Sequence, residues 1–392
     1  MIREERRLVL TPGPTTVEEP VRRALARPVT NPDVDPAFVE FYDGLTKKLA
    51  RIMGTSNPVL VLTGEGMLGL DAAVASLVEP GEPVLVVSNG VFGRGFGDLV
   101  ARYGGIPVLV ERPFDQAPAP EDLEATLAAH PGIRVATLVH CETPTGFLNP
   151  VETLLPVLQA HGVISIVDAV SSLGADRVDA DGWGIDVLLG ASQKALSAPT
   201  GLAFLSVSDR AWEKMERRQR PIPGFYANLL EWKRAWLDAA ERAFPYTPAA
   251  EAMVALDAAC DALLAEGLEH AQARHRRLAA AVRSALREAG FRLFAPEAHA
   301  ASGVTAFWPP EGIDERAFRR RLWEEQGVLM GGSVGEMAGR LWRVGHMGSG
   351  AREERLFRFM RAFEAQCRAV GVPLQGSPAK LFAEALEEGV GA

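Results

Sequence analysis

The feature that most constrains this sequence is a regular alternation of short apolar runs with longer amphipathic segments between about residues 55 and 210. Such runs are typical of a parallel sheet covered by helices, because a strand buried on both sides has no polar face. The predicted strands are 58–62, 83–88, 107–110, 134–139, 163–167, 186–189 and 202–207, with helices among them at 67–78, 121–130 and 151–161. The sequence therefore predicts a doubly wound α/β architecture.

The pattern changes after residue 244. Residues 249–290 read as one long helical stretch that ends at Gly290. Short strands near 304–308, 328–330 and 341–344, with helices near 315–325 and 352–369, predict a smaller α+β domain. A chain of 392 residues exceeds what one hydrophobic core usually serves. We expect an N-terminal segment at 1–55 that spans both domains, a large domain at 56–245, a small domain at 246–375 and a tail at 376–392.

Charge and composition exclude several classes of partner. The formal net charge of −9 gives the chain no general attraction for the phosphates of a nucleic acid. The three cysteines are too few and too scattered for a disulfide framework or a zinc site, and the histidines show no metal-ligand spacing. The N-terminus has no apolar core of a signal peptide, and no run approaches the roughly 18 apolar residues of a membrane helix. We therefore expect a cytoplasmic protein without a nucleic-acid, membrane or metal partner.

A glycine-rich turn lies between the first predicted strand and the next helix. Gly64-Glu-Gly66-Met-Leu-Gly69 matches the G-x-G-x-x-G pattern of dinucleotide-binding proteins. That interpretation requires an acidic residue for the ribose after the next strand, and the sequence has Ser88-Asn89 there. Free N–H groups at a helix start also bind phosphate. On local grounds the turn is either a phosphate site or a plain tight connection.

Two charged residues follow successive strands. Asp168 ends the run Ile164-Ser-Ile-Val-Asp168, and Lys194 comes 26 residues later among small residues. Each alone has an ordinary interpretation, a solvated loop carboxylate or a surface lysine. Together with an upstream phosphate turn they match the needs of pyridoxal phosphate: a lysine for the Schiff base, a carboxylate for the pyridine nitrogen and a phosphate cradle. Phe92, just past another strand, would either stack on a flat ligand or belong to the core.

Seven motifs in order then mark a resemblance. They are Thr11-Pro-Gly-Pro-Thr15, Thr63-Gly-Glu-Gly-Met67, Asn89-Gly-Val-Phe92-Gly, Thr143-Pro-Thr-Gly146, Val167-Asp-Ala-Val-Ser-Ser-Leu-Gly174, Gly190-Ala-Ser-Gln-Lys-Ala195 and Trp342-Arg343-Val-Gly345. Together they resemble the class V aminotransferases of fold type I, particularly the alanine–glyoxylate and serine–pyruvate/glyoxylate group. The resemblance covers residues 8 to about 370. It implies a large domain with a seven-stranded, mostly parallel sheet, a smaller C-terminal domain, and pyridoxal phosphate as cofactor.

The resemblance also implies roles for matching residues. Lys194 would form the Schiff base and move the proton, Asp168 would pair with the pyridine nitrogen, and Val170 and Phe92 would lie against the ring. Thr143 would contact the ring region, and Arg343 and Gly13 would bind the substrate. The remaining cofactor contacts would come from backbone N–H groups of Glu65, Gly66 and Met67, from Gln193, and from Thr247 of a partner subunit, which implies a homodimer with shared active sites.

Some positions depart from the family pattern. Glu65 stands where a serine often faces the phosphate, so we predict that its carboxylate turns away and only its N–H contributes. Met67 replaces a frequent histidine. Phe244 falls where a phosphate-binding tyrosine is common, so Tyr246 or Thr247 alone would serve. His270 and His275 on the long helix are expected at the surface, and His346 is a candidate to line the pocket.

The resulting hypothesis is an aminotransferase that moves an amino group from serine or alanine to glyoxylate or pyruvate by ping-pong half-reactions. The nearest alternatives are other enzymes of this fold: a lyase, a cysteine desulfurase or a ureidoglycine–glyoxylate aminotransferase. A desulfurase needs a thiol on a mobile loop, whereas Cys141 ends a strand and Cys260 and Cys367 lie in predicted helices. A nicotinamide dehydrogenase and a non-catalytic binding protein are more distant alternatives.

Overall fold

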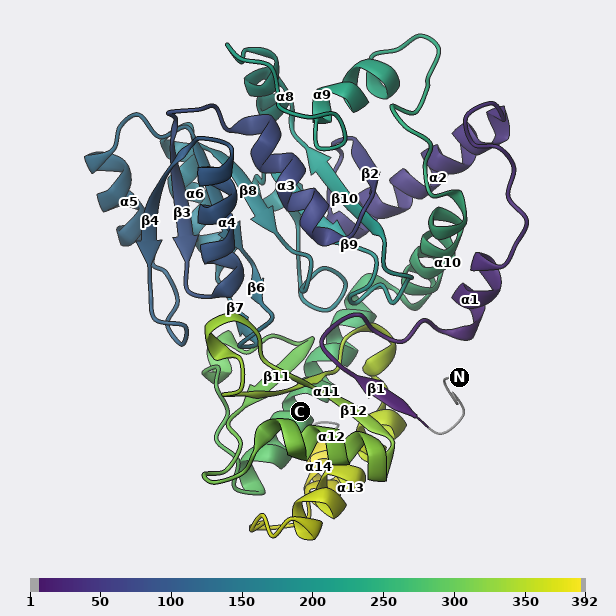
Figure 1. Ribbon diagram of the computed structural model, residues 1–392, viewed down its shortest axis with the longest axis vertical. Helices are drawn as coiled ribbons and strands as arrows, with labels where there is room; N and C mark the ends of the chain where they lie inside the picture. Colours follow the sequence, from purple (N-terminus) through teal and green to yellow (C-terminus); the bar gives the residue numbers. More distant parts are fainter. Residues whose placement is uncertain (1–6, 389–392) are drawn as a thin grey trace.

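A seven-stranded sheet forms the upper lobe of the computed structural model, which describes residues 7–388 (Figure 1). Its strand order is β2-β10-β9-β8-β5-β3-β4, and only β10 runs antiparallel to its neighbours. The strands are β2 Val59–Thr63, β3 Pro83–Ser88, β4 Ile106–Glu111, β5 Val135–Val139, β8 Ile164–Asp168, β9 Val187–Ala191 and β10 Leu202–Val207. All seven predicted strands are therefore present, and the doubly wound α/β prediction is confirmed.

Helices cover this sheet and connect its strands (Figure 1). The pair α3 (Gly66–Leu77) and α4 (Val91–Arg102) packs together, as does the pair α5 (Pro120–Ala129) and α6 (Val151–Ala160). Further helices in this lobe are α2 Pro36–Met53, α7 Ala180–Trp183, α8 Asp209–Glu216 and α9 Leu229–Trp232, which continues into a π-helical turn at Lys233–Leu237. A short hairpin, β6 (Cys141–Glu142) and β7 (Phe147–Leu148), points toward the lower lobe. The central strands are completely buried, which explains their unbroken apolar sequences.

A second, four-stranded sheet forms the lower lobe, in the order β1-β12-β13-β11. Its strands are β1 Leu8–Leu10, β11 Val304–Phe307, β12 Val328–Gly332 and β13 Trp342–Gly345. Helices α11 (Leu268–Glu288), α12 (Glu315–Gln326), α13 (Glu353–Ala369) and α14 (Pro378–Glu388) pack around it over a separate buried cluster. The sequence did not indicate β1, which pairs in parallel with β12 although more than 300 residues separate them.

The predicted single helix at 249–290 is wrong, because the chain forms two helices there. Gly267 has φ +86° and separates α10 (Ala250–Glu266) from α11. Helix α10 packs on α2 and on α1 (Glu19–Leu25), and the buried cluster around the large sheet extends to Ala271. The expected domain boundary at residue 245 stays a prediction.

His275 on α11 is buried, contrary to the prediction that it lies at the surface. Its Nε2 accepts a hydrogen bond from the Gly348 N–H at 2.9 Å, so Nδ1 bears the proton and donates to the Ala271 carbonyl at 2.6 Å. Burial lowers the pKa of His275 to about 4. Helical periodicity predicts which residues share a face of α11, but it does not reveal that the loop at Gly348 covers the face that carries His275. His270 is exposed as expected.

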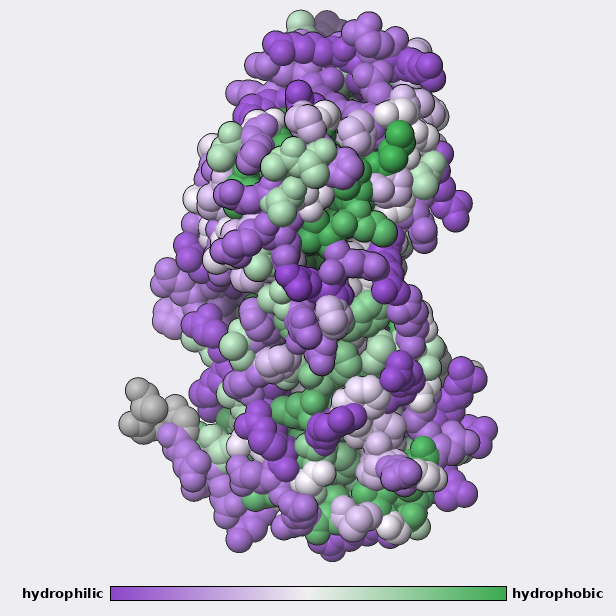
Figure 2. All heavy atoms as spheres, turned by 90° about the vertical axis from the view of Figure 1, so that its left-hand side faces the viewer, coloured by the Kyte–Doolittle hydropathy of each residue, from purple (hydrophilic) through white to green (hydrophobic). Residues whose placement is uncertain are grey.

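Within residues 7–388, no helix combines the length and the apolar character needed to cross a bilayer. Seen from the left-hand side of Figure 1, the molecule has two lobes with a largely hydrophilic surface and an apolar area in the upper half (Figure 2). The edge strand of the large sheet on this side, β4, leaves Ile106 and Leu109 about half exposed.

Candidate functional site

The predicted site residues converge on one cavity of about 290 Å³ between the large sheet and the N-terminal segment. Every residue to which the resemblance assigns a role lines it, except Thr247 and Arg343. The lining consists of Gly13, Pro14, Glu65, Gly66, Met67, Leu70, Phe92, Thr143, Asp168, Val170, Ser171, Gln193, Lys194 and Thr200. Pro14, Leu70, Ser171 and Thr200 are additions that the sequence did not indicate.

The topology of the sheet explains this convergence. Strands β2, β3, β5, β8 and β9 all run in one direction, so their carboxyl ends lie at one edge. Asp168 is the last residue of β8, and Lys194 follows β9 by three residues. Glu65 follows β2 and Phe92 follows β3. Residues far apart in the chain are therefore neighbours because they occupy the same position on successive strands.

Lys194 is held by the N-terminal segment. Its Nζ donates to the Pro12 carbonyl at 3.0 Å, and the Thr15 hydroxyl donates to the Lys194 carbonyl at 2.9 Å. Burial, together with the charge of Arg343, lowers the pKa of Lys194. Gly13 passes so close that a Cβ there would lie 2.5 Å from Lys194 Cδ, and its φ of +97° favours glycine. The missing side chain at Gly13 therefore leaves the space that the Lys194 side chain occupies.

Asp168 is a buried carboxylate that lines the same cavity as Lys194. Its Oδ1 accepts a hydrogen bond from the Val170 N–H at 2.8 Å. Burial raises the pKa of Asp168 to about 6, while that hydrogen bond and the charge of Lys194 oppose the rise. Lys194 and Asp168 therefore attract each other, yet they form no direct ion pair in the described part of the chain. Both groups line the cavity of about 290 Å³.

Glu65 lies at the glycine-rich turn that precedes α3, and the prediction that its carboxylate turns away from a bound phosphate stays a prediction. Its Oε2 accepts a hydrogen bond from Gln193 Nε2 at 3.3 Å, and both side chains line the cavity. Gln193 Oε1 is buried without a partner among the described residues. Gly66 begins α3, and a Cβ there would lie within 3.3 Å of Val170 and Ala191. The cradle therefore combines helix N–H groups with an acidic side chain.

Phe244, Tyr246 and Thr247, the segment from which a partner subunit was expected to reach the phosphate, lie away from the cavity of their own chain. Phe244 packs against Tyr42 and Trp236, at centroid distances of 5.1 and 4.7 Å, as part of the core. Tyr246 accepts a hydrogen bond from Trp232 Nε1 at 3.3 Å. The Thr247 hydroxyl donates to Asp33 at 2.8 Å. None of the three lines the cavity.

Arg343 connects the small sheet to the cavity wall. It lies on β13, is 8% exposed, and does not itself line the cavity. Its Nε donates to the Gly332 carbonyl at 2.8 Å and its Nη1 to the Thr143 carbonyl at 3.0 Å. Burial lowers its pKa to about 10. His346 is completely buried between Thr305 and Ser302, at 2.8 and 2.9 Å, and does not line the pocket as proposed from the sequence.

Two residues next to predicted ones were missed. Ser171 lines the cavity, and its hydroxyl is hydrogen-bonded to that of Thr143. Glu142 is completely buried behind Phe92. Ser171 lies inside one of the seven motifs and Glu142 directly precedes another, so both positions are next to residues that the sequence singled out. Their contacts were not available from the sequence, because they join segments that only the fold brings together.

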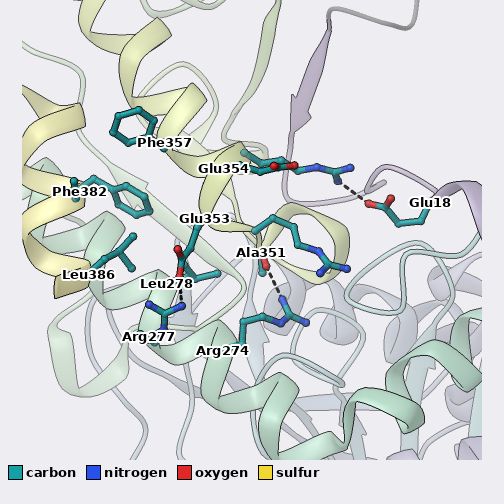
Figure 3. A pocket seen from close by; sticks show the side chains of 13 residues that line it. Glu18, Arg274, Arg277, Leu278, Ala351, Glu353, Glu354, Phe357, Phe382 and Leu386 are labelled. Carbon is teal, nitrogen blue, oxygen red and sulfur yellow. Dashed lines mark hydrogen bonds and ion pairs between the residues drawn. The ribbon is translucent and has the colours of Figure 1, made fainter. Parts of the chain in front are cut away.

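A larger cavity of about 830 Å³ lies on the small lobe and contains none of the predicted residues (Figure 3). It is lined mainly by α11, α13 and α14. Three of its four arginines are engaged: Arg355 pairs with Glu18 at 2.8 Å, Arg277 pairs with Glu353, and Arg274 donates to the Ala351 carbonyl at 2.6 Å (Figure 3). This groove contains none of the residues to which the sequence assigns a role in the chemistry, so the smaller cavity is the candidate active site.

The cysteines and the acidic groups give no support to other chemistry. Cys141, Cys260 and Cys367 are all buried, and burial raises the pKa of each thiol. A buried neutral thiol is a poor nucleophile, which argues against a desulfurase. Among residues 7–388, no group of three His, Cys, Asp or Glu side chains is arranged to bind a metal ion.

Comparisons with known proteins agree with this geometry. A model of the family "Aminotransferase class-V" matches residues 35–346. The pyridoxamine–pyruvate transaminase of Mesorhizobium japonicum is 37% identical over 88% of this chain and 87% of its own. The crystal structure of the pyridoxamine–pyruvate aminotransferase from Mesorhizobium loti matches with a TM-score of 0.93, 33% identity and 99% of both chains covered. The ureidoglycine–glyoxylate aminotransferase of Bacillus subtilis also gives 0.93, at 30% identity over 97% of this chain and 98% of its own. The chain therefore belongs to the class V aminotransferases, a family of pyridoxal-phosphate-dependent enzymes with the type I fold.

Proposed function

We propose that this aminotransferase exchanges an amino group between an amine and a small 2-oxo acid, with Lys194 as the proton carrier. Its lowered pKa increases the fraction of neutral amine, which is the form that accepts a proton. Nζ is held at 3.0 Å from the Pro12 carbonyl, on the cavity side of the N-terminal segment. Lys194 would take the proton from the reacting carbon of the donor and return it to the carbon of the acceptor.

The ring end of the cavity fits the family's cofactor. The pyridine ring of bound pyridoxal phosphate supplies a sink for the electrons of the deprotonated carbon. Asp168, buried in the wall of the same cavity as Lys194, would hold a proton at the pyridine nitrogen, while Val170 and Phe92 would enclose the ring. Among the described residues, Oδ1 of Asp168 already accepts the Val170 N–H, so Oδ2 is the oxygen available for that proton.

The phosphate end fits less well. The N–H groups at the start of α3 would attract an anion, but the Glu65 carboxylate lies beside them. Two carboxylates, Glu65 and Asp168, line the cavity, and Lys194 is the one cationic side chain among the lining residues. A phosphate dianion next to Glu65 would be repelled, whereas a neutral hydroxymethyl group would donate a hydrogen bond to it. Phe244 further removes the hydroxyl that a tyrosine would have offered.

This acidic cradle favours a pyridine without a phosphate as a substrate. The donor that we propose is pyridoxamine, with pyruvate as the acceptor and pyridoxal and alanine as the products. The names of two relatives, in Mesorhizobium japonicum and Mesorhizobium loti, state these two substrates. Arg343 would bind the carboxylate of the 2-oxo acid, since the Gly332 and Thr143 carbonyls fix the plane of its guanidinium. Gly13 would leave space for the same substrate.

The second candidate is transfer from serine or alanine to glyoxylate or pyruvate, with pyridoxal phosphate kept as the resident cofactor. It is supported by the family as a whole and by the helix N–H groups of the cradle. In this case Glu65 would have to be protonated or displaced from Gln193. The two candidates share Lys194, Asp168 and Arg343 and differ at Glu65.

An activity assay with matched substrates separates them. Purified protein receives pyruvate with either pyridoxamine or pyridoxamine 5′-phosphate, and alanine formation is measured. We expect kcat/KM to favour pyridoxamine by at least about tenfold, equivalent to about 1.4 kcal/mol. Glu65→Ser should reverse the preference, while Glu124→Ser, an exposed acid on α5, should leave it unchanged. Tight co-purification of pyridoxal phosphate with serine–glyoxylate activity would instead establish the second candidate.

We also propose that the working unit is a homodimer in the cytoplasm, with Thr247 contributing to the partner's site. Thr247 does not line the cavity of its own chain. Beside it in sequence is Tyr246, whose ring stacks at 4.3 Å on Tyr226. Tyr226 and Phe225 are about half exposed, which is typical of a surface that another protein covers. Light scattering should give twice the mass of 42.2 kDa.

A further inference from the structure

Glu142 is a buried carboxylate that reaches from the β6–β7 hairpin to the first turn of α4. Its Oε1 accepts a hydrogen bond from the Gly93 N–H at 2.7 Å, and its Oε2 accepts one from the Phe92 N–H at 3.1 Å. The side chain is completely shielded from solvent. A carboxylate that accepts two N–H groups at a helix start is well placed both for hydrogen bonding and for the helix dipole.

No side chain next to α4 in the sequence caps its N-terminus, and Glu142 provides this cap. The residue before α4 is Gly90, which has no side chain to cap the helix. A Cβ at position 90 would lie 2.3 Å from Glu142 Cδ, so glycine there makes room for the carboxylate. A serine or aspartate at the helix start would satisfy the same N–H groups locally, without burying an acid from another segment. The Glu142 carboxylate therefore not only caps the N-terminus of α4 but also connects this helix to the β6–β7 hairpin.

Both ends of this connection line the active-site cavity. Phe92, whose N–H is bound, lies in the wall proposed to contact the ring. Thr143, the next residue after Glu142, lines the cavity as well, and its carbonyl accepts the Arg343 Nη1 hydrogen bond at 3.0 Å. The Glu142 side chain is thus the direct link between the aromatic wall and the segment that anchors the arginine.

We propose that Glu142 is a positioning residue that fixes Phe92 against the pyridine ring and keeps it in register with Thr143. This inference rests on the proposed placement of the ring between Phe92 and Val170. It does not depend on whether the ring carries a phosphate. Loss of one hydrogen bond to the carboxylate would let the first turn of α4 shift, and the ring would then lose its fixed aromatic neighbour.

The test compares Glu142→Gln with Glu152→Gln, an exposed acid in the first turn of α6. The glutamine has the same shape but can accept with only one of its two terminal atoms. The probe is the pyridine aldehyde that wild type binds more tightly, pyridoxal or pyridoxal 5′-phosphate. Its Kd and its visible circular dichroism are measured, because the dichroism reports how rigidly the ring is held. Because the probe is chosen by the affinity of the wild-type protein, the result does not depend on which amino donor the enzyme uses.

For Glu142→Gln we expect Kd to rise by about tenfold, the size of one charge-assisted hydrogen bond, with weaker visible dichroism and native far-ultraviolet dichroism. Glu142→Asp, which keeps the charge but has one methylene fewer, should fall between wild type and the glutamine variant. Unchanged Kd and visible dichroism in Glu142→Gln would overturn the proposal. Wild-type binding of neither aldehyde would overturn the proposed function, and with it the ring placement assumed here.

A double-mutant cycle covers the case in which Glu142→Gln folds poorly. If Glu142 acts through the aromatic ring, its substitution should have little further effect on Kd in a Phe92→Leu background. Fully additive effects of the two substitutions would overturn the proposal, because they would indicate independent actions. The cycle can be run with Glu142→Asp in place of Glu142→Gln.

Discussion

At the level of single residues, Lys194, Asp168 and Gly13 stand out by the environment that surrounds each of them rather than by residue type. Lys194 is a buried lysine with a lowered pKa, and Asp168 is a buried aspartate with a raised pKa. Both shifts have burial as their largest cause, and the two groups face one cavity. Such opposed shifts are typical of acid–base sites, because each group is held near the protonation change that it must undergo. Gly13 matters for the opposite reason, since its lack of a side chain gives Lys194 its space.

Gly13→Ala should abolish most activity without unfolding the protein. The new Cβ would lie 2.5 Å from Lys194 Cδ and 2.8 Å from its Nζ, at a φ of +97°. We expect kcat to fall by at least about 100-fold, since small displacements of catalytic groups have effects of this size. Steady-state kinetics and circular dichroism measure the two properties. Gly95→Ala, where a Cβ meets nothing within 4 Å, is the control, and equal activity in both variants would contradict the prediction.

Asp168→Asn should stabilise the ligand-free protein at high pH while removing activity. Burial raises the pKa of Asp168 from 3.8 to about 6, so the folded state binds this proton more tightly than the unfolded state. The stability that the proton gives is present at low pH and is lost as pH rises through about 6. Urea unfolding should therefore show the advantage of the variant over wild type growing by about 1 kcal/mol between pH 5 and pH 8. A constant difference would show that Asp168 is already ionised at pH 5.

At the scale of elements, the strand ends and helix starts set the chemistry. The starts of α3 and α4 both face the cavity, and each has an acidic side chain beside it, Glu65 and Glu142. The break between α10 and α11 is equally local in origin. Gly267 takes a positive φ and turns the chain, so α10 stays with the large sheet while α11 packs under the small one. Neither helix by itself has a sequence that reveals this change of partner.

Gly267→Ala should destabilise the protein by about 1 kcal/mol, because a side chain is strained at a φ of +86°. The new Cβ would also lie 3.1 Å from His270 Nδ1. Equilibrium unfolding in urea measures the change. Gly44→Ala, inside α2 with open space around it, should be neutral or stabilising because alanine favours a helix. Equal stability of the two variants would mean that the bend at 267 can straighten.

At the scale of the whole molecule, the active site depends on both lobes and on the segment between them. The large sheet provides Asp168 and Lys194, and β13 of the small sheet provides Arg343. The N-terminal segment begins in the small sheet as β1, passes Lys194 at Pro12 and Gly13, and continues into α2 beside β2 (Figure 1). The relative position of the lobes therefore sets the distance between the lysine and the arginine.

Leu10→Ala tests this dependence. Leu10 is 1% exposed in the core of the small lobe, and its removal should cost about 2–4 kcal/mol. Because β1 leads directly to Gly13, activity should be lost on heating together with the small lobe, before the large sheet melts. Differential scanning calorimetry and residual activity are compared. Leu25→Ala, at a position 38% exposed on α1, should change stability by less than about 1 kcal/mol. Activity that outlasts the loss of the small lobe would contradict this dependence.

The sequence by itself determined the large sheet and most of the site. Buried strands have to be apolar throughout, and the residues after their carboxyl ends have to face one edge, so Asp168, Lys194 and the glycine turn could be located from the pattern alone. The contact of Glu65 with Gln193, the break between α10 and α11 at Gly267 and the pairing of β1 with β12 became clear only in the folded chain. These features depend on contacts between distant segments, such as Glu65 with Gln193, and local pattern has no information about them. The same reason applies to Glu142, because α4, whose N–H groups its carboxylate accepts, is brought next to it only by the fold.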